Sequence, residues 1–333
     1  MQNIPLQAEH YLFAVLNWGL GHASRSIAVI EYLLQHNKKI TLASDGIALE
    51  LLKQEFPTLP TIELPSYNIR YGKSFHAILF GNSPNVLKAI IHEKMTLNKL
   101  VRQNAFDCII SDSRFGFFHR KVPSYIISHQ LHIPAKPYVL FKILNAFNHF
   151  FLNRFEKVLV PDASTNLLSG KLSRPQGLKR IAYIGPVSRL SRQDQKQHKY
   201  DLCICLSGPE PARSILEGKL QKLLKHEDYK VILIRGTQKP IDGLPKHWET
   251  IALANRAQLN DIFTASNLIV SRAGYTSIMD YYILNKKAII IPTPGQMEQE
   301  YLAEHLNGNH GLSSLSEEEL HRLPELINAQ HAQ

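Results

Sequence analysis

The sequence predicts an α/β protein built from two doubly wound parallel sheets. Its 333 residues are enough for about two domains. Short apolar runs of strand length alternate with longer segments whose apolar residues recur at helical spacing, a pattern typical of βαβ units. The pattern restarts near residue 200 with a second strand, glycine loop and helix. Each half is therefore expected to form its own domain.

The first half supplies the elements of one sheet. Apolar runs predict strands over residues 11–17, 38–45, 61–65, 106–112, 123–129, 157–162 and 180–186. Helical spacing of the apolar residues predicts helices over residues 24–37, 46–56, 84–103 and 138–155. Because helices separate many of these strands, the strands are expected to run mainly parallel.

The second half repeats this alternation. Strands are predicted over residues 201–208, 229–236, 247–254, 267–274 and 287–295. Helices are predicted over residues 211–226, 257–266, 276–285 and 317–330. Pro209 and Pro211 stand at the start of the first of these helices, where a missing N–H costs little. Ser316 and Glu319 are spaced as a capping box for the last one.

Domain boundaries follow from this repeat. We place the first domain at residues 1–185, a basic linker at 186–199 and the second domain at 200–315. The segment 316–333 is expected to form a closing helix, with packing back on the first domain as one option. A single large sheet with one long surface loop is the alternative, but each half has its own strand, glycine loop and helix.

Composition excludes several classes of protein. Hydrophobic residues make up 44% of the chain and charged residues 20%, which is ordinary for a globular protein and argues against disorder. No apolar run is long enough for a membrane-spanning helix, and the N-terminal segment lacks the pattern of a secretory signal. The three cysteines are too few for a disulfide framework, and Cys203 and Cys205 alone are too few for zinc. We expect a cytoplasmic protein without a bound metal.

The charge balance points to an anionic partner. Lys and Arg number 38 against 28 Asp and Glu, a formal net charge of +10. Nucleic acid, an anionic membrane surface and a phosphorylated small molecule all fit, and the excess can also serve solubility alone. The sequence has no zinc pattern, RNA-stacking motif or clear helix-turn-helix, so a nucleic-acid partner is not expected.

The first candidate motif is NWGLGHASRS, residues 17–26, between the first strand and the first helix. Gly19 and Gly21 allow a tight turn and a close approach of the backbone to a ligand. The helix start behind them favours an anion. His22 has a side chain suited to general-base chemistry near neutral pH. A Gly-x-Gly turn with a purely structural role stays open, because the third glycine of the dinucleotide fingerprint is missing.

Two further motifs lie in the second half. SRAGYTSIMD, residues 271–280, leads from a strand into a helix that begins with hydroxyl-bearing residues, which suits a pyrophosphate. Asp280 could accept hydrogen bonds from the diol of a ribose, or it could be a solvated helix position. PTPGQMEQEY, residues 292–301, is a rigid turn into a helix, where Gln299 and Glu300 could bind sugar hydroxyls; an ordinary loop is the alternative.

Together the three motifs resemble the nucleotide-sugar glycosyltransferases of family 28, which include lipid II N-acetylglucosaminyltransferases and diacylglycerol galactosyl- and glucosyltransferases. They occur in the family's order over both halves, and YIGPVSR, residues 183–189, resembles its interdomain linker. The resemblance implies the GT-B fold, with two facing Rossmann-like domains and an interdomain cleft. It also implies a donor, usually a UDP-sugar, on the second domain, an acceptor on the first, inverting transfer, and no bound metal or other cofactor.

The resemblance also assigns site residues. Gly19, Gly21 and His22 would face the donor phosphates and the acceptor, Asp280 would bind the ribose, and Gln299 and Glu300 would contact the sugar. The remaining positions that it places at the donor phosphates are Ser207, Gly208, Arg272, Ala273, Gly274, Tyr275 and Thr276. His22 is the first choice for the catalytic base. Asp112 and His129 are alternatives because they end strands whose carboxyl ends would face the same cleft.

The predicted reaction moves a hexosyl group from a UDP-sugar to a hydroxyl acceptor that could be lipid-linked. The aromatic-rich segment 138–155, with Lys142 and Arg154, could rest on an anionic bilayer at the inner face of a membrane, or simply pack on the sheet. A nucleotide-sugar hydrolase is the alternative function. The sugar-nucleotide hydrolases of the pseudaminic acid pathway open with a similar Gly-x-Gly-His-x-x-Arg, here ending at Arg25.

Overall fold

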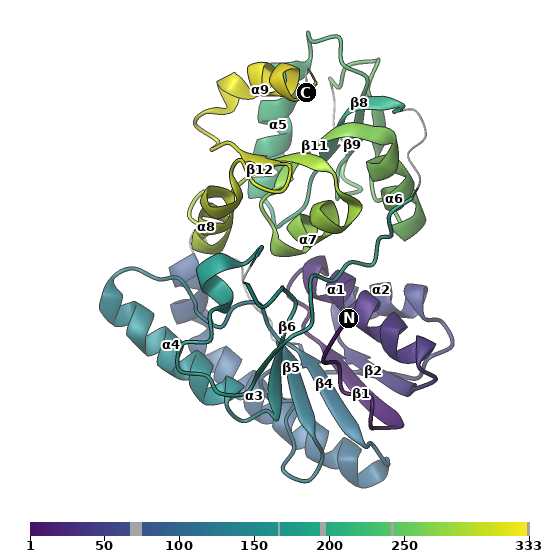
Figure 1. Ribbon diagram of the computed structural model, residues 1–333, viewed down its shortest axis with the longest axis vertical. Coiled ribbons are helices and arrows are strands. Elements are labelled where there is room, and N and C mark those ends of the chain that lie inside the picture. Colours follow the sequence, from purple (N-terminus) through teal and green to yellow (C-terminus); the bar gives the residue numbers. More distant parts are fainter. Residues whose placement is uncertain (67–74, 166, 194–197, 241–242, 332–333) are drawn as a thin grey trace. The chain divides into compact units, whose positions relative to one another are not determined.

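The computed structural model (Figure 1) describes residues 1–66, 75–165, 167–193, 198–240 and 243–331, and of residues 75–86 only the backbone. The chain divides into two compact units, Met1–Ser188 and Arg189–Gln333. The division falls inside the segment predicted as the linker, of which residues 194–197 lie outside the described residues.

The first unit is built on a parallel sheet, as predicted. Its seven strands are β1 His10–Val15, β2 Lys39–Ser44, β3 Thr61–Glu63, β4 Cys108–Asp112, β5 Ser124–Ile127, β6 Lys157–Val160 and β7 Ile181–Tyr183. They lie in the order β3-β2-β1-β4-β5-β6-β7, and every pair is parallel. The chain leaves β1 toward one edge and returns at β4 to build the other. Ligands bind outside the carboxyl ends of the strands at such a switch point.

Helices cover this sheet. They are α1 Leu20–Gln35, α2 Gly46–Glu55, α3 Phe75–Gln103 and α4 Tyr138–Leu152, with a short 3-10 helix at Gly170–Ser173. Leu97 of α3 and Leu152 of α4 belong to buried clusters with residues of β1, β4, β5 and β6. Helix α3 begins at Phe75, before the predicted start at residue 84, so the weak helix formers Gly81, Asn82 and Ser83 lie inside it.

The second unit also has a parallel sheet. Its strands are β8 Tyr200–Cys205, β9 Val231–Ile234, β10 Glu249–Ile251, β11 Ser266–Arg272, β12 Lys287–Ile291 and β13 Leu312–Ser314. They lie in the order β10-β9-β8-β11-β12-β13. The helices are α5 Ala212–Leu224, α6 Arg256–Ala265, α7 Tyr275–Leu284, α8 Met297–Leu306 and α9 Leu323–His331. Strand β13 escaped prediction because three residues carry no periodic pattern.

The closing segment corrects one prediction. Ser316 and Glu319 form the reciprocal hydrogen bonds of a capping box, but these lead only into a 3-10 turn at Leu320–Arg322. Helix α9 starts at Leu323, with Pro324 in its first turn. Leu323 and Ile327 are fully buried in the core that α5 shares with the second sheet. The closing helix therefore packs on the core of the second unit.

The structure bears on the predictions for the cysteines and for a membrane-spanning helix. Cys203 is fully buried in β8, and burial raises the pKa of its thiol well above the usual range, as expected for a core residue. Within the described part of the chain, no helix is long and apolar enough to cross a membrane.

A buried arginine ties the carboxyl end of the first sheet together. Arg114, which is fully buried, donates from Nε to the Val15 carbonyl oxygen at 2.7 Å and from Nη1 to Glu93 Oε1 at 2.9 Å. Its Nη2 donates to Asp45. Asp45 in turn accepts a hydrogen bond from Asn17 of the glycine loop at 3.1 Å. One guanidinium therefore links the ends of β1 and β2 to α3.

Replacing this arginine should destabilise the first unit strongly. We expect Arg114→Met to lower the free energy of unfolding by about 3–5 kcal/mol, because it leaves the buried carboxylates of Asp45 and Glu93 without their cation. Urea unfolding followed by circular dichroism measures the effect. Arg102→Met, at an exposed position of α3, is the matched control and should change little. Equal stabilities of the two variants would contradict this role.

Candidate active site

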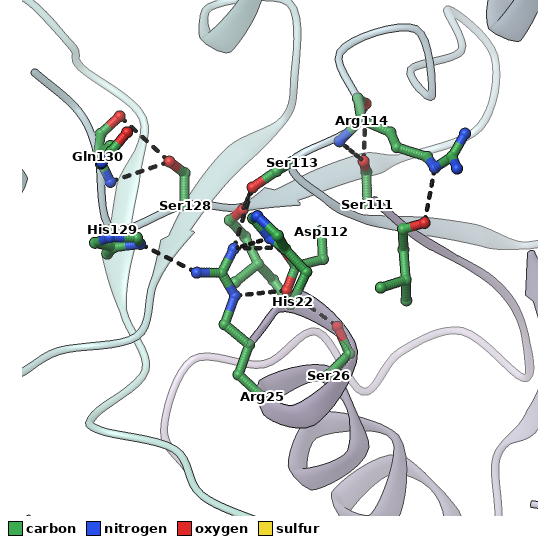
Figure 2. Close-up of polar contacts among 12 residues, drawn as sticks. His22, Arg25, Ser26, Ser111, Asp112, Ser113, Arg114, Ser128, His129 and Gln130 are labelled. Atoms are coloured by element: carbon green, nitrogen blue, oxygen red, sulfur yellow. Dashed lines mark hydrogen bonds and ion pairs between the residues drawn. The ribbon is translucent and has the colours of Figure 1, made fainter. Parts of the chain in front are cut away.

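Three side chains of α1 converge on the last residue of β4. His22, Arg25 and Ser26 are three and four residues apart, so they lie on one face of the helix. Strand β4 pairs directly with β1, and α1 begins just after β1. The start of the helix therefore lies over the end of β4, and Figure 2 shows all three side chains pointing toward Asp112. This is the switch point of the sheet.

Asp112 is fully buried and accepts four hydrogen bonds from these side chains. Oδ2 accepts from Arg25 Nε at 2.7 Å and from Ser26 Oγ at 3.0 Å. Oδ1 lies 2.8 Å from His22 Nδ1 and also accepts from Arg25 Nη2. Burial alone would raise the pKa of Asp112, but Arg25 and His22 hold it well below its usual range. The group is therefore a carboxylate whose two oxygens are both engaged.

This carboxylate selects the tautomer of His22. An ionised carboxylate only accepts hydrogen bonds, so Nδ1 carries the hydrogen and Nε2 keeps its lone pair. Arg25 Nη2 lies 2.9 Å from the same Nδ1, but a guanidinium donates only and cannot bond to a nitrogen that is itself donating. His22 is thus oriented through one nitrogen, while the other is a proton acceptor.

The charge state of His22 suits a base. Burial lowers the pKa of the imidazole below its usual 6.5, and the Arg25 guanidinium lowers it further. Asp112 opposes both effects. The side chain is 20% exposed, so it is accessible although its surroundings are largely dry. A neutral imidazole with an unprotonated Nε2 can take a proton from a substrate hydroxyl.

The structure brings the three candidate bases together and separates their roles. His129, just after β5, lies with Nδ1 3.1 Å from Arg25 Nη1 and is 9% exposed. Asp112 is a poor base because both of its oxygens are occupied and its pKa is depressed. His22 fits the role best, and Asp112 orients it. The sequence analysis missed Ser26 and saw Arg25 only in the hydrolase-like opening; their spacing from His22 along a helix was the available signal.

The glycine loop has the conformation that its sequence suggested. Gly19 is the N-cap of α1 with φ at 78°, in the region that favours glycine. An added Cβ at Gly19 would meet nothing within 4 Å, so the backbone angle, and not crowding, calls for glycine. Gly21 is exposed in the first turn of α1.

The donor-site candidates of the second unit follow β8 and β11. Ser207 and Gly208 are exposed just after β8, and Gly208 has φ at 102°. Gly274 is the N-cap of α7, which then begins with Tyr275 and Thr276. Asp280 of α7 is 7% exposed and lies near Cys205 at the end of β8. Burial, with the charge of Asp280 adding to it, raises the pKa of that thiol to about 12.

Arg272 has a different place from the one predicted. Its side chain is buried and donates to the carbonyl oxygens of Pro292 at 3.1 Å and Ala212 at 2.9 Å. It also forms an ion pair with Glu317 at 2.7 Å. The guanidinium is committed to the fold, so we assign it a structural role. The neighbouring Ala273 is fully buried, so only its backbone could serve a ligand.

Gln299 and Glu300 hold the turn in front of their own helix. The Thr293 N–H donates to Gln299 Oε1 at 2.9 Å, and the Gly295 N–H donates to Glu300 Oε1 at 2.7 Å. Gln299 is partly buried and Glu300 is exposed. Both side chains thus fix the backbone after β12. Among the residues that the structure describes, no group of three or more His, Cys, Asp or Glu could hold a metal ion.

Comparison with solved structures identifies the fold. CalG4, the calicheamicin glycosyltransferase, matches with a TM-score of 0.69 at 13% identity, over 98% of this chain and 91% of that one. MurG of Acinetobacter baumannii matches with a TM-score of 0.55 at 13% identity, over 97% and 91%. Two Rossmann-like α/β units with these neighbours define the GT-B fold of glycosyltransferases.

Sequence comparison gives similar proteins for most of the chain and a family model for its second half. Residues 196–331 match the family model of the Glycosyltransferase family 28 C-terminal domain. An uncharacterized glycosyltransferase of Methanopyrus kandleri is 22% identical over 286 residues, 79% of this chain and 80% of that protein. The UDP-N-acetylglucosamine–N-acetylmuramyl-(pentapeptide) pyrophosphoryl-undecaprenol N-acetylglucosamine transferase of Staphylococcus epidermidis is 22% identical over 82% of this chain and 75% of that protein. These matches confirm the predicted resemblance to family 28-type GT-B glycosyltransferases.

Proposed function

We propose that the protein transfers a hexosyl group from a UDP-sugar to a hydroxyl acceptor with inversion and without a bound metal or other cofactor. The observation that carries this proposal is His22, partly exposed at the switch point of the first sheet and hydrogen-bonded to the buried carboxylate of Asp112 at 2.8 Å. This pair supplies an oriented neutral base, which deprotonation of an acceptor hydroxyl requires.

In the proposed reaction, His22 Nε2 takes the proton of the acceptor hydroxyl while its oxygen attacks the anomeric carbon. The bond from that carbon to the diphosphate breaks, and UDP leaves with the electron pair. Attack opposite to the leaving group inverts the anomeric configuration. Asp112 stays ionised throughout and stabilises the imidazolium that forms, which is the role of the buried carboxylate in other histidine-based sites.

The second unit would bind the donor. The start of α7, with Gly274 as its N-cap, favours an anionic diphosphate. Ser207 and Gly208, just after β8, would form a second contact with the diphosphate. Asp280 would accept hydrogen bonds from the ribose, and Gln299 with Glu300 would contact the sugar. The choice of UDP is supported by the name of the Staphylococcus epidermidis relative, which specifies a UDP-sugar.

A lipid-linked acceptor and a membrane-bound position form part of the proposal. The same relative acts on a carrier named as an undecaprenol. Helix α4 packs through Leu144 and Phe151 but leaves a second apolar face in water, with exposures of 67% for Tyr138, 61% for Ile143 and 57% for Phe150. Lys142 lies over the Tyr138 ring and Arg154 over the Phe150 ring. Such a face suits the inner, cytoplasmic surface of an anionic membrane.

Hydrolysis of the nucleotide-sugar is the second candidate, favoured only by the Gly-x-Gly-His-x-x-Arg opening at residues 19–25. The two reactions differ in the nucleophile. Incubation with UDP-sugars and candidate acceptors, followed by UDP detection, separates them. Release of UDP that depends on an acceptor supports transfer, and equal release with water alone supports hydrolysis.

The base assignment predicts the effect of one substitution. His22→Ala should lower kcat by at least about a hundredfold, because no other group replaces the oriented imidazole. UDP binding should change little, since the second unit would hold the donor. Steady-state kinetics and calorimetric titration with UDP measure the two effects. His92→Ala, at an exposed position of α3, is the control. Turnover of His22→Ala at the wild-type rate would refute the assignment.

The assignment of Asp280 to the donor site predicts an effect on UDP binding. Asp280→Ala should weaken UDP binding by about tenfold or more, since hydrogen bonds to a charged acceptor contribute about 1.5–3 kcal/mol. UDP should also raise the melting temperature of the wild type more than GDP or TDP does, because a ligand that binds only the native state stabilises it. Glu304→Ala, exposed on α8, serves as control. An unchanged dissociation constant in Asp280→Ala would argue against the ribose contact.

The membrane proposal predicts a selective loss of binding. Phe150→Ser and Ile143→Ser should reduce sedimentation with vesicles that contain anionic lipid, because each removes an exposed apolar side chain from α4. Ile47→Ser removes an apolar side chain of similar exposure from α2 and should leave binding unchanged. Vesicles of neutral lipid should bind all proteins weakly. Equal binding of the α4 and α2 variants would exclude this face.

A further inference from the structure

We infer that Arg25 is a positioning residue for the base, because its guanidinium holds the carboxylate that orients His22 and neutralises the charge of that carboxylate. This inference rests on the proposed function and deepens it. Nothing in the chemistry of transfer requires an arginine at this place, since a histidine and a carboxylate already form an oriented base.

The geometry shows how completely Arg25 is engaged. The side chain is 2% exposed, although it carries a permanent charge. Its Nε and Nη2 bond to the two oxygens of Asp112, a bidentate pairing of fixed orientation. Nη2 also donates to Ser113 Oγ at 3.1 Å, and Nη1 lies 3.1 Å from His129 Nδ1. Arg25 therefore joins α1 to the ends of both β4 and β5 (Figure 2).

Arg25 changes the balance of charge around His22. The charged and titratable groups that act on the imidazole are Arg25 from α1, Asp112 at the end of β4 and His129 after β5. Ser26 and Ser113 bond to Asp112 and Arg25 and complete this cluster. In a simple pair of histidine and carboxylate, the negative charge favours the imidazolium. Here the guanidinium cancels that charge, so protonation of His22 would leave a net positive charge in a largely dry site.

The consequence is a base that stays available in mildly acidic solution. Burial and Arg25 both lower the pKa of His22, and Asp112 only partly offsets them. Without the guanidinium, Asp112 would stand as an uncompensated anion beside the imidazole and would favour its protonated form. The protonated form has no lone pair on Nε2 and cannot deprotonate an acceptor. Arg25 thus links the orientation of the base to its charge state.

Titration of His22 by NMR tests this directly. Protein labelled with ¹³C at histidine Cε1 gives one signal per histidine, and loss of a signal in His22→Asn assigns His22. We expect its midpoint below pH 6.5 in the wild type and above 6.5 in Arg25→Gln. Arg25→Lys keeps the positive charge and should stay near the wild type. Arg102→Gln is the matched control on the surface of α3.

The rate should follow the titration. At pH 6, kcat/KM of Arg25→Gln should fall by about tenfold relative to the wild type, and the loss should shrink above pH 8, where His22 is neutral in both proteins. A purely structural role would instead lower the rate equally at every pH.

The outcomes separate this inference from the proposed function. An unchanged His22 midpoint in folded Arg25→Gln would overturn the role of Arg25 even if transfer is observed. A shifted midpoint without any transfer by the wild type would refute the proposed function but keep the charge relation. If Arg25→Gln fails to fold, the wild type still decides, because a His22 midpoint at or above 6.5 contradicts the inference.

Discussion

The buried carboxylate of Asp112 is the interaction on which the first unit's site depends. A carboxylate without water is unfavourable unless donors surround it, and here one helix face supplies them all. The need for these donors fixes the rotation of α1 about its own axis relative to β4. A rotation by one residue would move the side chains of His22, Arg25 and Ser26 away from Asp112 together. The same bonds fix the ring of His22. The same hydrogen bonds therefore set both the orientation of the base and the packing of the helix.

Three consecutive residues at the end of β4, Asp112 to Arg114, take part in two buried networks of hydrogen bonds. Asp112 faces α1, whereas Arg114 bonds to the ends of β1 and β2 and to α3. Ser113 between them has φ at 61°, a conformation uncommon for a residue with a side chain. This left-handed residue lets the backbone direct the two charged neighbours to different partners. The second network supports the first, because it holds the segment that leads from β1 into α1, at Val15 directly and at Asn17 through Asp45.

Much of this architecture could be predicted from the sequence. The strand and helix patterns were strong because both sheets are parallel and buried, and the glycine loops mark strand ends. His22, Asp112 and His129 were found because the carboxyl ends of parallel strands meet at one edge. The role of Arg25 was not found, since pairing across 87 residues leaves no local pattern. The burial of Arg272 was missed for a similar reason: its partner Glu317 lies in the closing segment.

The central claim is that Asp112 orients His22 for catalysis, and Asp112→Asn tests it most directly. The amide has nearly the same shape but only one acceptor oxygen, so it cannot both receive the His22 hydrogen and pair with Arg25 as the carboxylate does. kcat and the dissociation constant of UDP should be measured on the same preparation. The account predicts a kcat at least about a hundredfold lower with UDP binding intact. A kcat within about threefold of the wild type, in a protein that binds UDP normally, would contradict it.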